Sequence, residues 1–577
     1  MAAPSENQSS PAWRSSAFIA AGLAALALVI AQLPRAALSL PLYSGDEGSY
    51  LIRALYGALL KADPSHAATV ADIDNSVFFW IIRGVHMLGG KHYLDLLRVL
   101  GGCAYVGGLV LVWRAARPDL NRAEAAGALV LALLYPYYRF VLSALPEGWY
   151  VGLLAVIIFL TVRLWRSRPL VHALATGALT AALILIKPHG VAIGAAMCGL
   201  IVIDFLFDAQ RRLTISAARL GLYVVAFLAV GHLIQFIEGR GPPQGLMFFG
   251  HGFYSNIMAV APSPEAPRIG VVAAFSMTVA SMLLAGPPIA LGLDRLMARW
   301  LAQREGFRFE PRDLMFLLIL GGLVATMAMV TGFAVKASAF GASESYRLWG
   351  RYFEFFTPLL WISAWSYVRE AERLPDRRLL AAGVVLAGFV GLSITLKEAI
   401  TLFPWDAAGL GAFFIPTHRW AGSHFPSYAF AAGAVAAALV LMLRRAPMLP
   451  IWQGLFATLG LISGWQDVAW MSEILPDRAA VVAETGGVLQ KTARTNGRIA
   501  AFVDDNNLYN NVFLRLEGRP KMILISPTTT VTAADVAPFS MVLVQKPHAL
   551  NAPGWMLVQP GGKIQVYQRG SLDTPIR

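Results

Sequence analysis

Four short polar clusters interrupt a largely apolar chain, and each places a carboxylate or a cation near the end of an apolar segment. The first cluster is the adjacent pair Asp46-Glu47, which separates a long apolar run from the helical pattern over 51–60. The other three contain Glu147 after Pro146, Lys187 and His189 around Pro188, and Arg351 with Tyr352. A carboxylate can take a proton from an attacking hydroxyl, while cations hold a phosphate by charge-assisted hydrogen bonds. These residue types would therefore suit a reaction between a hydroxyl and a phosphate-bearing compound.

The composition is that of a membrane protein. Of the 577 residues, 57% are hydrophobic and only 14% are charged, and the mean hydropathy is +0.58, whereas soluble domains carry about 25% charged residues. The net charge of +13 does not indicate a nucleic-acid partner, because the arginines concentrate in short loops between apolar runs, as membrane orientation requires. The two cysteines, Cys103 and Cys198, lie in apolar stretches and predict neither a disulfide framework nor a metal cluster.

About thirteen apolar stretches are long enough to cross roughly 30 Å of hydrocarbon. The first has no well-fitting cleavage site, so we expect it to remain as an anchor. The predicted spans are 17–33, 96–113, 124–142, 148–165, 169–186, 189–207, 217–236, 271–291, 314–333, 353–368, 379–396, 427–443 and 451–466.

The arginines also predict the orientation of these spans. With a cytoplasmic N-terminus, every inner loop carries at least two arginines, and all four polar clusters fall on the outer face. The first outer loop, 34–95, contains amphipathic helical patterns at 47–60 and 75–88 that would lie in the membrane interface. We therefore predict a multi-pass protein of the bacterial inner (plasma) membrane, with its active site facing the periplasm.

The chain changes character near residue 471. Beyond that point it is less apolar, and a helical pattern over 478–493 precedes five strand-like runs, at 499–503, 522–525, 541–544, 556–558 and 564–567. The sequence thus predicts a transmembrane catalytic domain over 1–470 and a small soluble α/β domain over 471–577. The soluble domain would lie in the periplasm only if the thirteenth predicted span crosses the membrane. It contains no phosphate-binding loop, dinucleotide fingerprint or zinc spacing.

Each cluster on its own also has a purely structural interpretation. The carboxylates could simply cap the helices that follow them. Lys187 and Arg351 could be anchors whose charged ends reach the interface, and a single histidine such as His189 is more often structural than a ligand. The functional interpretation is favoured because two carboxylate sites share one membrane face with two or three cations, Arg139 included.

The order of these motifs resembles that of the polyprenyl-phosphate-dependent glycosyltransferases with the GT-C fold. That family carries an acidic motif, often Asp-Glu followed by a tyrosine, just after its first span. The run Asp46-Glu47-Gly48-Ser49-Tyr50 matches it, although Arg-Tyr is frequent where this chain has Gly48-Ser49. The later matches are Glu147 after the third span, Lys187 with Gly190 after the fifth, and Arg351, Tyr352 and Pro358 at a later one. In layout the chain looks most like the aminoarabinose and protein mannosyl branches.

The resemblance implies a fold and a reaction. The fold would be an α-helical, GT-C-like membrane domain with about 13 transmembrane helices, interfacial helices in the first outer loop and a small C-terminal α/β domain. The reaction would be an inverting transfer of a hexosyl or pentosyl unit at the outer face. The donor would be a polyprenyl-phosphate-linked sugar, and the acceptor a hydroxyl of a lipid, a glycan or a protein.

The resemblance also implies roles for the residues of the four clusters. Asp46 would be the general base, assisted by Glu47 and Glu147. The donor phosphate would be bound by Lys187, His189, Arg351, Tyr352 and Arg139. Clustered carboxylates would permit a divalent metal, but no spacing requires one, and the reaction needs no nucleotide.

The main alternative is a transporter or lipid flippase, and a second is a non-catalytic scaffold for envelope assembly. A transporter should place ionisable residues near the bilayer midplane and show related halves. Here the charges stand at the outer ends of the predicted spans and no repeat is evident. A scaffold would not need acidic residues at several separate outer turns.

Overall fold

The structure is a computed structural model, and it describes most of the membrane part and nearly all of the C-terminal domain. The described residues are 22, 26, 30, 40–41, 45–62, 75–120, 122–207, 213–239, 264–303, 306–337, 347–367, 401–402, 406, 408–410, 423–424, 449–495 and 497–570. The predicted spans 379–396 and 427–443, and nearly all of 17–33, lie outside these residues.

Two amphipathic helices follow the first predicted span, where the sequence predicts interfacial helices. Helix α2 (Asp46–Ala62) begins with its two carboxylates in the first turn, where unpaired backbone N–H groups favour negative charge. Helix α4 (Ser76–Gly89) buries its apolar face. The ring of Tyr50 in α2 packs edge-on against that of Phe78 in α4, with 5.4 Å between centroids.

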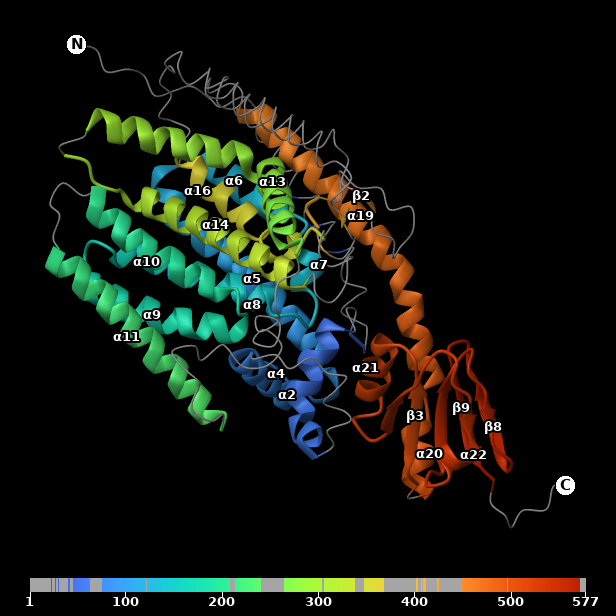
Figure 1. The fold of residues 1–577 in the computed structure, drawn as a ribbon. Coiled ribbons are helices and arrows are strands. Elements are labelled where there is room, and N and C mark those ends of the chain that lie inside the picture. Colours follow the sequence, from blue (N-terminus) through green and yellow to red (C-terminus); the bar gives the residue numbers. More distant parts are fainter. Residues whose placement is uncertain are drawn as a thin grey trace.

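A bundle of apolar helices forms the membrane part (Figure 1). Six helical stretches of the described chain are long and apolar enough to cross a membrane, and a seventh is counted if the bent α13 is one span. The elements are α5 (Tyr93–Ala116), η3 (Arg117–Asp119), α6 (Arg122–Leu134), α7 (Tyr138–Val141), α8 (Glu147–Leu164), α9 (Pro169–Ile186), α10 (Gly190–Phe207), α11 (Leu213–Ile237), α13 (Ala266–Ala302), α14 (Pro311–Ala337), η5 (Gly350–Tyr352) and α16 (Phe356–Trp365), with η2 (Gly90–His92) leading into α5.

Two of the predicted spans are shorter than expected because of prolines. The helix predicted over 124–142 ends at Leu134, since Pro136 disfavours the helical conformation of the residue before it. The helix predicted over 353–368 begins only at Phe356. The ring of Pro358 would clash with the carbonyl of residue 354 if the helix extended that far back.

Small residues let α8 lie close to α5. A Cβ on Gly152 would stand 2.9 Å from the carbonyl oxygen of Ala104, and one on Gly108 would stand 3.1 Å from the Cα of Gly152. Such close backbone approach is typical of membrane helix pairs. It fixes the start of α8, and therefore the position of Glu147, against the rest of the bundle.

The C-terminal domain is an α/β domain, as predicted. Its five-stranded sheet has the order β4-β3-β6-β9-β8, in which β3 pairs in parallel with β4 and β6, while β9 pairs antiparallel with β6 and β8. Each of the five strands overlaps its predicted run. The elements are α20 (Val488–Thr495), β3 (Ile499–Val503), α21 (Asn506–Arg515), β4 (Lys521–Leu524), β5 (Val531–Thr532), α22 (Ala533–Val536), β6 (Met541–Gln545), β7 (Leu550–Asn551), β8 (Trp555–Pro560) and β9 (Ile564–Arg569), and a further pair in the membrane part is β1 (Thr401–Leu402) with β2 (Ser423–His424).

A single helix, α19 (Leu449–Glu484), connects the two parts and passes residue 471 without interruption. The core of the C-terminal domain is also not confined to residues after 471. Ile52 and Leu60 of α2 belong to the same buried cluster as Val512 of α21, and the rings of Tyr56 and Phe513 meet edge-on at 5.4 Å. The C-terminal domain therefore lies on the face of the bundle that carries Asp46 (Figure 1).

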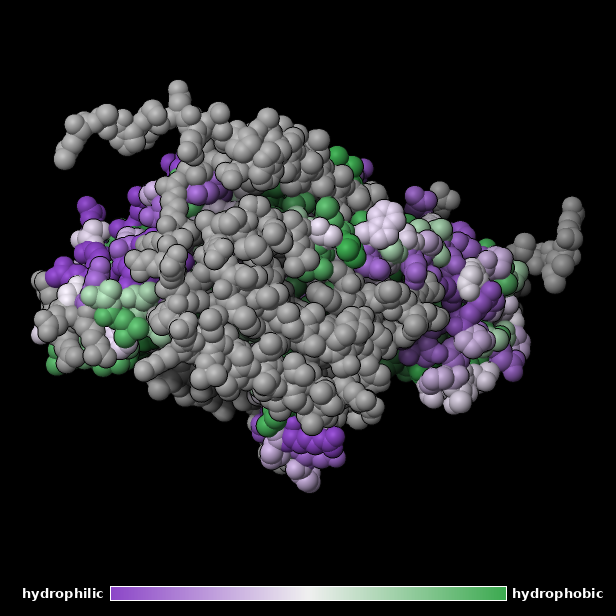
Figure 2. All heavy atoms as spheres, turned by 90° about the horizontal axis from the view of Figure 1, so that it is seen from above, coloured by the Kyte–Doolittle hydropathy of each residue, from purple (hydrophilic) through white to green (hydrophobic). Residues whose placement is uncertain are grey.

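The surfaces of the two parts differ in polarity. Figure 2 shows hydrophilic side chains gathered over the C-terminal domain, at the right of the view. The helices of the bundle instead leave large apolar side chains exposed, among them Leu206, Val225, Leu233 and Phe236. This contrast is expected when one part faces lipid and the other faces water.

Candidate active site

Three helix starts and one short 3-10 turn bring the predicted site residues to the same end of the bundle. Asp46 lies in the first turn of α2, and Glu147 is the first residue of α8, directly after Pro146. Lys187 and His189 flank Pro188 in the turn between α9 and α10, where the proline prevents one continuous helix. Arg351 and Tyr352 belong to η5.

Arg351 joins two of these elements through its guanidinium group. Its Nη2 lies 2.6 Å from Oδ2 of Asp46, and its Nε lies 3.3 Å from Oε1 of Glu147. The backbone of Arg351 is held on both sides, since its N–H donates to the carbonyl of Asp406 and its carbonyl accepts from the hydroxyl of Tyr137 at 2.8 Å. Arg351 is thus a fixed cation between two carboxylates.

Lys187 extends the cluster on the other side of Glu147. Its Nζ donates to the same Oε1 of Glu147 at 2.7 Å and stands 4.8 Å from the centre of the Tyr352 ring. The imidazole of His189 also packs on Tyr352, with 4.4 Å between ring centroids. Glu147 Oε2 and His189 Nδ1 are buried and lack a hydrogen-bond partner within the described chain, so both could accept or donate to a bound compound.

The carboxylates of this cluster differ sharply in exposure. The side chain of Asp46 is 50% exposed, whereas that of Glu147 is 1% exposed. The surrounding protein partly desolvates the half-exposed Asp46 carboxylate and thereby raises its pKa. The Arg351 guanidinium, with Arg347 and Lys187 further away, outweighs that effect and lowers the pKa below its usual 3.8. Asp46 is therefore an ionised carboxylate that a second molecule can reach.

The cations respond to the same neighbours. Burial lowers the pKa of Lys187, and so does Arg351, while Glu147 raises it, and the net shift is downward. For Arg351, burial lowers the pKa, but Asp46 and Glu147 together raise it well above its usual value. Arg351 therefore carries a permanent positive charge. A further anion would favour the protonated form of Lys187, whose pKa is lowered in the free site.

Two of the predicted site residues point elsewhere. Glu47 is fully buried and its Oε2 accepts the backbone N–H of Ala144 at 3.0 Å, which ties α2 to the segment before α8. Arg139 forms a buried ion pair with Asp467 of α19, at 2.7 Å. The Phe140 ring contacts the guanidinium groups of both Arg139 and Arg351, at 4.9 and 5.8 Å, so Arg139 lies behind the cluster.

Several supporting residues were not singled out from the sequence. Arg347 makes a bidentate pair with Asp406, at 2.5 and 2.6 Å, and its guanidinium lies over the ring of Trp349, which stacks on Tyr352. Asn75 donates to the carbonyl of Ile186 at 2.5 Å and so fixes the end of α9 beside Lys187. Arg347 stands in the fourth polar cluster and was within reach of sequence reasoning, whereas Asp406 and Asn75 carry no recognisable motif.

The cluster combines one exposed carboxylate with two cations, which suits a phosphate placed next to a hydroxyl. Within the described residues, no group of three or more His, Cys, Asp or Glu side chains lies close enough to hold a metal ion. Both carboxylates instead lie against Arg351.

The helical bundle, the charged cluster at one end of it and the α/β domain resting on α2 define a multi-pass membrane protein with a GT-C-like fold. The crystal structure of ArnT from Cupriavidus metallidurans bound to undecaprenyl phosphate has a similar fold. Its TM-score is 0.50 at 15% sequence identity, over 98% of this chain and 100% of that one. At this identity the likeness establishes the fold alone.

Two further solved structures are similar at lower scores. The arabinosyltransferase EmbB from Mycobacterium smegmatis has a TM-score of 0.41 at 15% identity, over 86% of this chain and 44% of that one. The Archaeoglobus fulgidus oligosaccharyltransferase has a TM-score of 0.43 at 11% identity, over 94% of this chain and 70% of that one. No protein-family model matches the sequence, and no curated protein matches it.

Proposed function

We propose that the protein is a membrane glycosyltransferase that moves a sugar from a polyprenyl-phosphate donor to an acceptor hydroxyl on the periplasmic face of the inner membrane. The observation that carries this proposal is the contact of the exposed Asp46 carboxylate with Arg351, which Glu147 links to Lys187. The ArnT structure, similar in fold, is described as bound to undecaprenyl phosphate, which supports a lipid phosphate as the ligand of these cations.

In this proposal, Lys187 and Arg351 hold the phosphate that links the sugar to its lipid. The charged ends of both side chains already contact one atom, Glu147 Oε1. The ring of Tyr352 packs against Lys187, His189 and Arg351. The guanidinium plane can bind two phosphate oxygens at once. The phosphate is also the leaving group, so the same cations stabilise the negative charge that develops on it.

Asp46 takes the proton of the acceptor hydroxyl. The acceptor oxygen attacks the anomeric carbon from the face opposite the phosphate, the bond from that carbon to the phosphate oxygen breaks, and the lipid phosphate leaves with the bonding electrons. The anomeric configuration is thereby inverted. When the phosphate occupies Arg351, the Asp46 carboxylate loses part of its ion pair, so its pKa rises and it becomes a better base.

The remaining predicted residues support this centre from behind. Glu47 orients the start of α2 through Ala144, and Arg139 packs Phe140 against the site from its pair with Asp467. His189 and the second oxygen of Glu147 are available to the sugar or to the acceptor. The identity of the transferred sugar, hexosyl or pentosyl, depends on contacts outside this cluster.

The test is the pair of substitutions Asp46→Asn and Glu47→Gln. Asn keeps the shape of Asp46 but cannot accept the proton, so turnover should fall about 10²- to 10⁴-fold, with donor binding retained. Gln at position 47 can still accept from Ala144, so its loss should be far smaller. Half or more of wild-type turnover in Asp46→Asn would exclude the proposed base.

Donor binding is tested separately with a polyprenyl-phosphate analogue. Arg351→Lys should weaken binding more than Lys187→Arg, because only an arginine offers the two-pronged contact. The two alanine variants should be non-additive when combined, since both groups would contact one phosphate. Wild-type binding by both alanine variants would place the donor elsewhere.

A further inference from the structure

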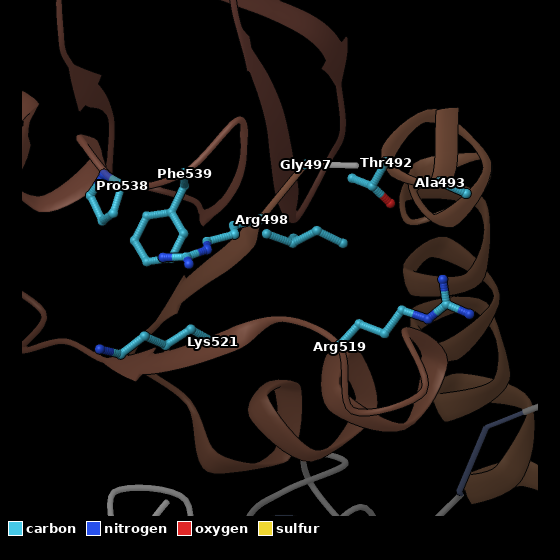
Figure 3. Close-up of a pocket in the computed structure, with 9 residues that line it drawn as sticks. Thr492, Ala493, Gly497, Arg498, Arg519, Lys521, Pro538 and Phe539 are labelled. Carbon is cyan, nitrogen blue, oxygen red and sulfur yellow. The ribbon is translucent and has the colours of Figure 1, made fainter. Parts of the chain in front are cut away.

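We propose that the C-terminal domain contains a second binding site, which takes an acidic saccharide, that is, a sugar carrying a phosphate or a carboxylate. The site is a cavity of about 590 Å³ at the amino ends of the parallel strands β3, β4 and β6 (Figure 3). This volume is in the range of small-molecule binding pockets. The inference concerns this domain alone and does not depend on the proposed transfer reaction.

The charge of the cavity selects an anion. Among the described residues, its lining contains Arg498, Arg519 and Lys521 and no carboxylate. Arg519 is partly neutralised by Glu517, 3.3 Å away, but no ion pair with Arg498 or Lys521 is found in the described chain. Two cations at the mouth of one cavity repel each other, and a phosphate or carboxylate between them would relieve that repulsion.

The arrangement of the cations is set by the sheet. Lys521 begins β4 and pairs in register with Ala500 of β3, two residues after Arg498. The carbonyl of Arg498 accepts the backbone N–H of Ser540 at 3.0 Å and the Ser540 hydroxyl at 3.1 Å. Figure 3 shows the side chains of Arg498 and Lys521 extending toward the same side, while Arg519 extends toward the helix of Thr492 and Ala493. The backbones of Arg498 and Lys521 are thus fixed by the sheet before any ligand binds.

The apolar part of the cavity selects a ring rather than a bare ion. Phe539 and Ile499 line it and are 8% and 5% exposed. Pro538 extends the same wall (Figure 3). A sugar ring can pack against this wall while its acidic group contacts the cations, whereas an inorganic phosphate makes only the contact with the cations.

The cavity is distinct from the cluster around Asp46. Helix α2 lies along α21, with Gly45 near Asn507 at one end and Leu59 near Gly518 at the other. Gly518 immediately precedes Arg519, and Leu59 lies beyond a kink of α2 at Tyr56. The part of α2 from Asp46 to Tyr56 alone rises roughly 15 Å, so the cavity lies beyond the far end of this helix from Asp46. A monosaccharide bound at Arg498 and Lys521 cannot reach the Asp46 carboxylate.

The experiment measures ligand binding to the full-length protein in detergent, by calorimetry at low salt. The probes are glucose 6-phosphate and glucuronic acid, with glucose as the ring without charge and inorganic phosphate as the charge without ring. We expect both acidic sugars to bind, at least tenfold more tightly than phosphate or glucose. The affinity should fall as salt is raised.

Substitutions then assign the binding to the cavity. Arg498→Gln and Lys521→Gln should each weaken glucose 6-phosphate binding at least tenfold. Lys546→Gln removes an exposed cation at the other end of β6 and should bind like wild type. Equal affinity for phosphate and glucose 6-phosphate, wild-type binding by both cavity variants, or no binding of either acidic sugar would each overturn the proposal.

Discussion

The contact between α2 and α21 makes Gly48 a position where one methyl group should impair catalysis. A Cβ on Gly48 would lie 2.7 Å from the Cβ of Asn510 and 3.0 Å from its Cγ. Carbon atoms pack at about 3.6 Å, so Gly48→Ala forces the two helices apart by about 0.9 Å. Rotation of the Asn510 side chain can move its Cγ, but both Cβ atoms are fixed by their backbones, so the 2.7 Å contact remains.

That displacement acts directly on the candidate base. Asp46 precedes Gly48 by two residues, and its contact with Arg351 is 2.6 Å long. A shift lengthens this contact by its component along the contact, to at most about 3.5 Å, which is beyond a strong charge-assisted hydrogen bond. A misplacement of this size can lower turnover by as much as about 100-fold. We expect Gly48→Ala to fold and to lose most of its transfer activity.

The assay is transfer from a polyprenyl-phosphate sugar in reconstituted vesicles, with two matched variants. Asn510→Gly removes the opposing Cβ and should restore Gly48→Ala in the double variant, and it should lower the helix propensity of α21 by only about 0.3 kcal/mol. Gly57→Ala lies on the same helix, where an added Cβ meets nothing within 4 Å, and should be fully active. Full activity of Gly48→Ala, or failure of Asn510→Gly to rescue it, would refute this reasoning.

Three further predictions follow from the site and from the membrane frame. Arg351 lowers the pKa of Asp46 below 3.8 in the free protein, so kcat/KM should be lost only as the pH falls below about 4. Arg351→Gln should move this acid limb of the pH profile to higher pH. An acid limb that does not move would mean that Asp46 is not the titrating group. Asp467→Asn removes the negative charge of the buried ion pair with Arg139, so it should lower the stability by about 3–5 kcal/mol in thermal unfolding. Arg139→Met combined with Asp467→Leu should recover most of this loss and keep the wild-type KM for the donor. In a background without Cys103 and Cys198, cysteines at Lys91 and Asp505 should react with an impermeant reagent from outside, and a cysteine at Arg168 only after permeabilisation; outside labelling at Arg168 would invert the orientation.

Much of the architecture could be predicted because membrane helices and short strands leave strong local signals. The predicted range 169–186 coincides with α9 and 499–503 with β3, since an uninterrupted apolar run bounded by prolines or turn residues has few alternatives. The helix ends at Leu134 and Phe356 were missed because a single proline outweighed the apolar pattern around it.

The candidate site was only partly predictable, for a different reason. Sequence reasoning located Asp46, Glu147, Lys187 and Arg351 because each stands at the end of a span. It could not show that Glu47 and Arg139 point away, since adjacent residues at a helix start differ in direction and a buried pair such as Arg139 with Asp467 joins distant segments. The same limit applies to Asp406, whose partner Arg347 lies 59 positions earlier.

The sharing of one core by α2 and the C-terminal domain has a consequence for the order of biosynthesis. During synthesis, α2 emerges before the helices of the bundle and α21 emerges after them. Ile52 and Leu60 must wait for Val512 and Phe513 before their apolar face is covered. Until then the apolar face of α2 has no packing partner in α21, so a nascent or truncated chain does not hold the Asp46 carboxylate in place against Arg351. Catalytic competence would thus arise only after α21 has been made and has packed against α2.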